Sequence, residues 1–188
     1  MGNGKKKEVL LKPNELNEFH NMTSLSTEIL IKLHEHYRRF SAINTDDGVI
    51  DYKEFCTLIN KSNTNLAKRI FNAIDANKDG YINFREFVKF LSCFDTGTLE
   101  DQINLSFSIL CDPFSKNIES ECIKNLLKEA IYIDSSFKKF FTEDVIDNIV
   151  NETYKKLVGE TKGNLDLQLY NKMIRENPDL LSWFKIDL

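Results

Sequence analysis

Oxygen-bearing side chains recur at short, regular intervals in one segment near the end of the N-terminal half. Asp75, Asn77 and Asp79 alternate along the chain, and Glu86 closes the segment. Hard cations such as calcium take six to eight oxygen ligands at roughly 2.3–2.6 Å, and carboxylate and amide oxygens supply them. Gly80 lies inside the segment, where a sharp turn favours a residue without a Cβ atom. The pattern predicts a calcium-binding loop.

The spacing matches that of the EF-hand loop at every constrained position. At the seventh position, Tyr81 is expected to direct its backbone carbonyl at the ion, and Asn83, at the ninth, to bind through a water molecule. Glu86, at the twelfth, would supply both carboxylate oxygens. Ile82 is expected to face inward and to pair with a second loop. The alternative, a polar surface turn between helices, requires the whole spacing to arise by chance.

A related loop lies upstream, but its first half departs from the pattern. Gly48 and Glu54 fall at the sixth and twelfth positions, whereas counting back from Glu54 places Ile43, which has no side-chain oxygen, at the first. If the preceding helix ends at Phe40, the loop is 14 residues long. Two extra residues can place backbone carbonyls where ligating side chains normally lie.

Two interpretations of this first loop remain open. In one, it binds a second calcium ion, with Asp47 and Glu54 supplying the charge. In the other, it stays empty and only pairs residues 49–51 with residues 81–83 as a short two-stranded contact. The pairing is expected in both cases.

The two loops in the C-terminal half lack most metal ligands. After Asp112 the chain continues with apolar and basic residues, and its closing position is Cys122. The fourth loop closes with Leu169 instead of a carboxylate. We expect both loops to be metal-free and to be held together by a contact between Ile118 and Leu165.

Apolar residues recur at helical spacing on both sides of every loop. They give eight helices in four pairs, an internal repeat. We therefore expect an all-α fold with two EF-hand lobes of the calmodulin-like superfamily, short two-stranded loop pairings and a hinge near residues 95–97. The expected units are a flexible N-terminal segment (1–25), a calcium-binding N-terminal EF-hand pair (26–94), a degenerate C-terminal EF-hand pair (98–176) and an apolar C-terminal tail (177–188).

Composition excludes several function classes. With 188 residues, 41 % hydrophobic and 29 % charged, the chain is an ordinary globular one of one to two domains. A net charge of -4 argues against a nucleic-acid partner. No apolar run approaches a membrane span, and no secretory signal is visible. Four cysteines without metal spacing predict reduced thiols in a cytosolic protein. No catalytic or nucleotide-binding motif is present, so we predict that the chain is not an enzyme.

Each end of the chain carries a separate hypothesis. Gly2 is placed as in an N-myristoylation signal, although Lys6 stands where that signal has Ser or Thr. Neighbouring lysines would then add an electrostatic contact with a membrane surface; the alternative is a solvated start of the chain. The apolar tail either occupies the protein's own groove until a target displaces it, or packs as a terminal helix on the C-terminal lobe; its apolar residues are Leu180, Leu181, Trp183, Phe184, Ile186 and Leu188.

These motifs together resemble the four-EF-hand calcium sensors of the calcineurin B-like and neuronal calcium sensor type over about residues 26–184. The long first loop is especially similar to calcineurin B-like proteins, as are Arg69-Ile70-Phe71 before Asp75 and Asn177-Pro178-Asp179-Leu180-Leu181 near the end. The resemblance implies a calcium sensor or adaptor that regulates a protein partner by holding its amphipathic helix in an apolar groove. The partners implied are a kinase, a phosphatase or a membrane protein.

A weaker resemblance is to calaxin-type EF-hand subunits of the ciliary dynein docking complex. It implies the alternative function, a constitutive structural subunit of a larger assembly with an axonemal partner and with calcium as a modulator. The locations consistent with both resemblances are the cytoplasm, a membrane surface and a cilium or cytoskeletal assembly.

Overall fold

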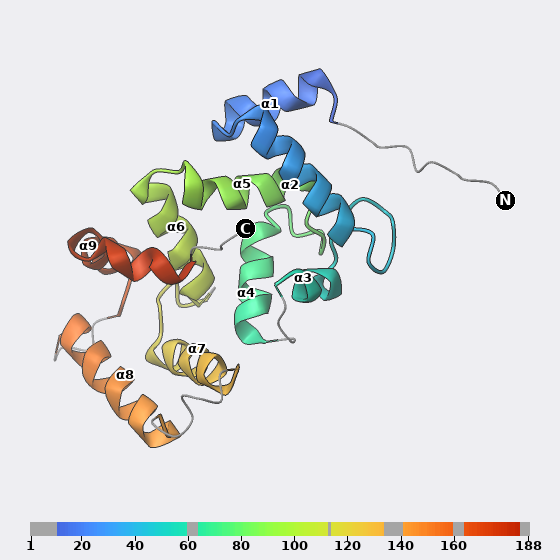
Figure 1. Ribbon diagram of the computed structural model, residues 1–188. Helices are drawn as coiled ribbons and strands as arrows, with labels where there is room; N and C mark the ends of the chain where they lie inside the picture. Colours follow the sequence, from blue (N-terminus) through green and yellow to red (C-terminus); the bar gives the residue numbers. More distant parts are fainter. Residues whose placement is uncertain (1–10, 60–63, 113, 134–140, 160–163, 185–188) are drawn as a thin grey trace.

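A computed structural model describes residues 11–59, 64–112, 114–133, 141–159 and 164–184 (Figure 1). The described part is built from helices and two isolated bridges, which confirms the predicted all-α fold. In chain order the helices are α1 (Pro13–Thr23), α2 (Thr27–Phe40), α3 (Tyr52–Leu58), α4 (Asn65–Ile74), α5 (Phe84–Asp95), α6 (Leu99–Leu110), α7 (Ser120–Ile133), α8 (Glu143–Val158), α9 (Leu167–Glu176) and the 3-10 helix η1 (Pro178–Phe184).

Helix starts follow local hydrogen bonding that the sequence makes available. The N-cap residue Ser26 accepts a hydrogen bond from the N–H of Ile29 at 3.3 Å. Thr98 and Asp101 form a capping box at the start of α6. These caps satisfy N–H groups that a helix leaves without internal partners, and they fix where the loops begin and end.

The loops meet in pairs through one residue each. Ile50 and Ile82 exchange two backbone hydrogen bonds of 2.9 Å, and Ile118 bridges to Leu165 in the same antiparallel manner. All four side chains are almost fully buried. Both predicted loop pairings are therefore confirmed, each as a single residue pair.

One hydrophobic core runs through both halves of the chain. It includes aromatic contacts such as Phe55 with Phe71 and Phe107 with Tyr170, both with ring centroids 5.6 Å apart. Figure 1 places α1, α2 and α5 together at one end, α7 and α8 at the other, and α4 and α6 between them. Residues of the two predicted units, 26–94 and 98–176, therefore pack into one core.

Helix α4 links the two halves through polar contacts as well. The Arg69 guanidinium donates to the carbonyls of Ile109, Leu110 and Cys111, at the C-terminal end of α6, over 3.1–3.3 Å. The Glu129 carboxylate of α7 accepts from the first N–H groups of α4, at 3.1 and 3.2 Å. Both contacts place a charge at the helix end whose partial charge it complements.

The N-terminal segment is not irregular throughout, which corrects the prediction of a flexible stretch over residues 1–25. Residues 13–23 form α1, which packs on α2 and α5. Pro13 favours the first helical turn because its φ is fixed. Phe19 is buried against Val88 and meets Phe84 edge-on, with centroids 5.1 Å apart. Sparse apolar residues at helical spacing were enough to bury one face of this helix.

The structure describes the proposed hinge but only part of the two ends of the chain. Thr96, in the proposed hinge, donates its hydroxyl to the carbonyl of Thr23 at 2.6 Å, so the connection is held to α1. Leu181 of η1 is buried in the shared core, whereas Leu180 is half exposed. Residues 1–10, which include Gly2, and residues 185–188 lie outside the described residues. None of the described helices combines the length and hydropathy needed to cross a membrane.

Candidate metal centre

The second loop begins where α4 ends, at Asp75. This residue is 3 % exposed. One oxygen, Oδ2, accepts a hydrogen bond from the N–H of Gly80 at 3.0 Å. The other, Oδ1, is buried and has no hydrogen-bond partner among the described residues. Because an unpaired buried carboxylate oxygen is costly, this atom is the clearest sign of a missing positive partner.

The middle of the loop folds through hydrogen bonds from side chain to backbone. Asn77 Oδ1 accepts from the N–H of Asp79, and Asp79 Oδ1 accepts from the N–H of Tyr81, both at 2.9 Å. Gly80 has a φ of +86°, in the left-handed region where a Cβ atom is strained. These turns hold the two polar side chains on the loop and leave the Tyr81 side chain 46 % exposed.

Glu86, the predicted closing ligand, is 8 % exposed and already hydrogen bonded to the loop. Its Oε1 accepts from the N–H groups of Ala76 at 3.1 Å and Asn77 at 3.3 Å, and its Oε2 accepts from the N–H of Asn83 at 3.1 Å. In return the N–H of Glu86 donates to Asn83 Oδ1, which makes a capping box at the start of α5. A carboxylate has about four acceptor positions, so three N–H donors leave about one for a cation.

The donor set suits a hard cation. In the described part of the chain, no group of three or more His, Cys, Asp or Glu side chains is gathered as a metal cluster. Ligands in the second loop would therefore have to include the Asn77 amide and the Tyr81 carbonyl beside the carboxylates, all of them oxygens. An all-oxygen set fits calcium better than a softer metal, and among the described residues Asp75 Oδ1 has no other partner.

The first loop repeats the closing half of the second. Glu54 is 2 % exposed; its Oε1 accepts from the N–H groups of Asn44 at 3.0 Å and Thr45 at 3.5 Å, and its Oε2 from that of Asp51 at 3.1 Å. Asp47 Oδ1 accepts from the N–H of Val49 at 3.2 Å. The two predicted residues thus take the places that Glu86 and Asp79 take in the second loop.

Two residues that sequence analysis missed lie at these loops. Tyr37 of α2 donates its hydroxyl to the carbonyls of Gly48 and Ile82, both at 2.9 Å, and so joins one loop to the other. Burial raises the pKa of the Tyr37 hydroxyl far above its usual range, and the nearby carboxylates add to the shift. Ser41 is fully buried, and its Oγ has no hydrogen-bond partner among the described residues. Its place directly after an entering helix was the available signal.

The third loop uses its acidic residue differently. Asp112 Oδ1 accepts from the N–H groups of Phe114 at 2.9 Å and Ser115 at 2.7 Å, and these hydrogen bonds lower the pKa of the Asp112 carboxyl. At the closing position, the Cys122 Sγ lies 3.2 Å from the carbonyl oxygen of Leu110. In the fourth loop, residues 160–163 lie outside the described residues. The metal-free state of both loops stays a prediction.

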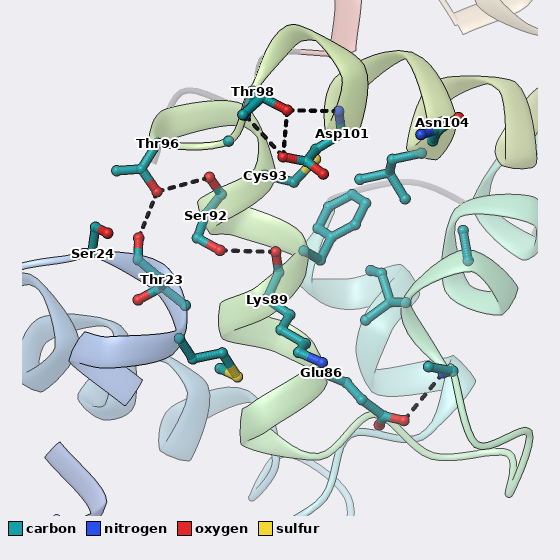
Figure 2. Close-up of a pocket in the computed structure, with 17 residues that line it drawn as sticks. Thr23, Ser24, Glu86, Lys89, Ser92, Cys93, Thr96, Thr98, Asp101 and Asn104 are labelled. Atoms are coloured by element: carbon teal, nitrogen blue, oxygen red, sulfur yellow. Dashed lines mark hydrogen bonds between the residues drawn. The ribbon is translucent and has the colours of Figure 1, made fainter. Parts of the chain in front are cut away.

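A pocket of about 510 Å³ lies beside the second loop, between the ends of α1 and α4 and the facing sides of α5 and α6. Figure 2 shows Glu86 at one end of this pocket, with its carboxylate directed to the backbone of the loop, and Cys93 farther along. Burial, with a contribution from the Asp101 carboxylate, raises the pKa of the Cys93 thiol to about 11. The thiol is therefore protonated and weakly nucleophilic near neutral pH.

Comparison with known proteins agrees with this geometry. Residues 66–94, which contain the second loop and all but one residue of each flanking helix, match the family model of the EF hand domain. This segment is therefore similar to the EF hand domain, a match that implies calcium binding.

Relatives extend the likeness over most of the chain. The calcium-binding protein NCSA of Dictyostelium discoideum is 28 % identical over 94 % of this chain and 95 % of its own length. Calcineurin B type 2 of the same organism is 28 % identical over 87 % of this chain and 86 % of its own. Calaxin of Bos taurus is 29 % identical over 63 % and 55 %.

The chain is thus related to calcium-binding proteins of the calcineurin B and neuronal calcium sensor type and to calaxin. Because the relatives that cover most of it are a calcium-binding protein and a calcineurin subunit, the prediction that it is not an enzyme is confirmed.

Proposed function

We propose that this protein is a calcium sensor whose second loop holds one Ca²⁺ ion. The residues that would hold the ion are Asp75, Asn77, Asp79, Tyr81 through its carbonyl, Asn83 through a water molecule, and Glu86. The observation that carries the proposal is the buried Asp75 Oδ1, which lacks any other partner among the described residues. Three carboxylates in such a loop commonly give sensor affinities of roughly 10⁻⁷–10⁻⁵ M.

Glu86 would connect a bound ion to helix α5. To bind with both oxygens, its carboxylate must give up at least one of the N–H donors at Ala76, Asn77 and Asn83. Asn83 and Glu86 also cap α5. Rearrangement of this carboxylate therefore changes the hydrogen bonding at the first turn of α5, the kind of local event that opens EF-hand pairs.

The site is tested by calorimetric titration of the stripped protein with CaCl₂. Glu86→Gln keeps the shape of the side chain and removes the charge, and is expected to weaken binding on the order of 100-fold. Asp112→Asn is the matched control, because the Asp112 carboxylate is occupied by two N–H groups of the third loop. A stripped wild-type protein that takes up no calcium at millimolar concentration would refute the sensor function.

We further propose that calcium controls the binding of a partner's amphipathic helix to an apolar groove. The names of two relatives, calcineurin B type 2 and calcineurin B-like protein 5 of Arabidopsis thaliana, favour a phosphatase or a kinase as partner. The unit 26–94 would respond to calcium and the unit 98–176 would support it. A fluorescent apolar probe should brighten on addition of calcium to the wild-type protein and not to Glu86→Gln.

The second candidate function is a constitutive structural subunit in which calcium is only a modulator. The contacts of α4 with both halves favour it, because Arg69 and Glu129 tie the calcium loop's entering helix to α6 and α7. Affinity capture with calcium or with chelator separates the two functions. A sensor should recover different partners in the two conditions, and a structural subunit should recover the same ones.

A further inference from the structure

The third loop starts and ends in the same register as the second, 36 residues farther along the chain. Each loop begins at the residue that follows its entering helix, which is Asp75 after α4 and Cys111 after α6. Each of these residues donates its N–H to the carbonyl four residues earlier, at 2.9 and 2.8 Å. The twelfth residue of the second loop is Glu86. Counted in the same way, the twelfth residue of the third loop is Cys122.

The positions between these ends agree as well. Lys116, at the sixth position of the third loop, has a φ of +57°, and Gly80, at the sixth position of the second, has +86°. Ile118, at the eighth position, forms the bridge of the C-terminal pair, as Ile82 does in the N-terminal pair. At its described residues the third loop therefore keeps the twelve-residue frame of the second, and its first and last positions are both cysteines.

The first and twelfth positions of an EF-hand loop face the same ion. In the second loop, Glu86 reaches back to N–H groups at the start of the loop. In the third loop, the Cys122 Sγ lies 3.2 Å from the carbonyl oxygen of Leu110. Because that oxygen belongs to the peptide group that leads into Cys111, the Cys122 Sγ lies within about 6 Å of the Cys111 Cα. The two thiols are thus brought together as the two carboxylates are in the second loop.

The surroundings of the two thiols suit a thiolate pair. Both cysteines are free and half-buried. Burial raises the pKa of both thiols, whereas the nearby Arg69 guanidinium lowers it. Arg69 donates to the carbonyl of Cys111 at 3.1 Å, and Cys122 lies in the first turn of α7, at the positive end of the helix dipole. A bound cation would offset the cost of burial, because coordination deprotonates a thiol.

We propose that Cys111 and Cys122 form a binding site for a soft, thiolate-binding cation, with Zn²⁺ as the test ion. The third loop is predicted to be metal-free because it lacks the oxygen ligands that calcium needs, but thiolates select softer metals than calcium. Across the described residues no third His, Cys, Asp or Glu side chain is gathered with the two thiols. Water would therefore complete the four-coordinate shell that zinc prefers.

The test is a calorimetric titration of the full chain with ZnCl₂. The protein is kept reduced with a phosphine, and excess CaCl₂ keeps zinc away from the carboxylates of the first two loops. One zinc ion should bind and release about two protons, because thiols bind the metal as thiolates. Repeating the titration in buffers of different ionisation enthalpy counts these protons. A site built from carboxylates would release almost none, since carboxylates are already ionised at neutral pH.

Serine substitutions identify the ligands. Cys111→Ser and Cys122→Ser should each weaken zinc binding about 100-fold or more, because each removes a direct ligand. Cys93→Ser is the matched control, since Cys93 is a half-buried cysteine within α5, and should bind zinc as the wild-type protein does. Zinc should raise the Tm of the wild-type protein and of Cys93→Ser but not that of the two loop variants.

Alkylation of the wild-type protein gives a readout that requires no variant to fold. Zinc should slow the reaction of Cys111 and Cys122 with iodoacetamide, followed by mass spectrometry, and should leave the rates at Cys56 and Cys93 unchanged.

The outcomes of these tests are independent of the calcium function. No zinc uptake, uptake without proton release, or equal effects of zinc on all four cysteines would overturn the inference. The proposed calcium site would stand in each case, because it contains no thiol. If instead the stripped protein takes up zinc but no calcium, the calcium function fails and the thiol site stands.

Discussion

The first two loops of this chain are alike in their closing halves and different in their opening halves. Both have a glycine with positive φ, a bridging isoleucine, a capping residue and a buried glutamate in the same register. They differ directly after the entering helix, where Ser41 takes the place of Asp75 and two residues are inserted. The closing half is therefore fixed by folding requirements, and the opening half is where metal-binding strength can vary.

The C-terminal pair supports this separation of folding from metal binding. Its bridge between Ile118 and Leu165 forms although the third loop closes with Cys122. Tyr154 of α8 donates its hydroxyl to the carbonyl of Ile118 at 2.8 Å, as Tyr37 does to that of Ile82 at 2.9 Å. The bridge between two loops thus forms from buried aliphatic residues and a tyrosine contact even where the closing position of one loop carries no carboxylate.

The largest expected effect tests whether the two N-terminal loops contribute equally to folding. Ile50 and Ile82 are both 0 % exposed, so Ile50→Ala and Ile82→Ala should each lower the free energy of unfolding by about 3–4 kcal/mol, from the lost burial and the cavity left behind. Urea unfolding in chelator measures both. A loss at one position less than half that at the other would break the equivalence of the closing halves.

Sequence periodicity and spacing were sufficient to predict the paired loops and most helices. The bridging residues lie in the loop segments that were expected to pair, and the N-caps Ser26 and Thr98 are of residue types that favour this position. Helix α1 was missed because its few apolar residues, Leu16 and Phe19 among them, sit in a polar stretch. Its helical state depends on burial against Phe84 and Val88, which lie far away in sequence.

The candidate site, too, could be predicted from the sequence only in part. The oxygen donors of the second loop could be recognised because their spacing is local. The orphaned oxygens of Asp75 and Ser41 could not, because burial and the lack of a partner are properties of the packed molecule. The exact ends of α2 and α4 also matter, since only they show that Ser41 and Asp75 are equivalent.

An intermediate effect is expected from the two loop glycines. A Cβ atom at Gly48 or Gly80 would meet nothing within 4 Å, so Gly→Ala at either position adds backbone strain without a clash. At φ near +82° and +86° that strain should cost about 1–2 kcal/mol in each loop. Thermal unfolding in chelator gives the comparison. A Gly48 variant that loses no stability would show that the first loop's turn is less constrained than the second's.

A smaller effect should follow from removing the tie between the loops. Tyr37→Phe deletes one hydroxyl that donates to Gly48 and Ile82, and should cost about 1 kcal/mol. Tyr154→Phe makes the matching deletion in the C-terminal pair. Because Tyr37 contacts both loops, its loss should also weaken calcium binding, whereas Tyr154→Phe should leave it unchanged. Equal calcium affinities for both variants would show that the tie has no part in presenting the ligands.

The smallest expected effect concerns His34 of α2, the helix before the first loop. Its side chain contacts α5, the helix after the second loop. Its ring meets Phe84 edge-on, with centroids 4.9 Å apart. Burial, with a smaller contribution from the Arg38 charge, lowers the pKa of His34 below its ordinary value of 6.5. The unfolded chain therefore binds a proton more readily than the folded one, and stability should fall as the pH drops from about 6.5 through the folded-state pKa.

Denaturant unfolding between pH 7.5 and pH 5 tests this dependence. His34→Gln should flatten the part of the pH profile that lies below about 6.5. His36→Gln, a change at an exposed histidine of the same helix, is the matched control. If protonation of His34 loosens its contact with Phe84, calcium affinity should fall over the same pH range, because Phe84 lies two residues before Glu86. If the calcium affinity of His34→Gln has the same pH dependence as that of the wild-type protein, this dependence does not arise from the contact between His34 and Phe84.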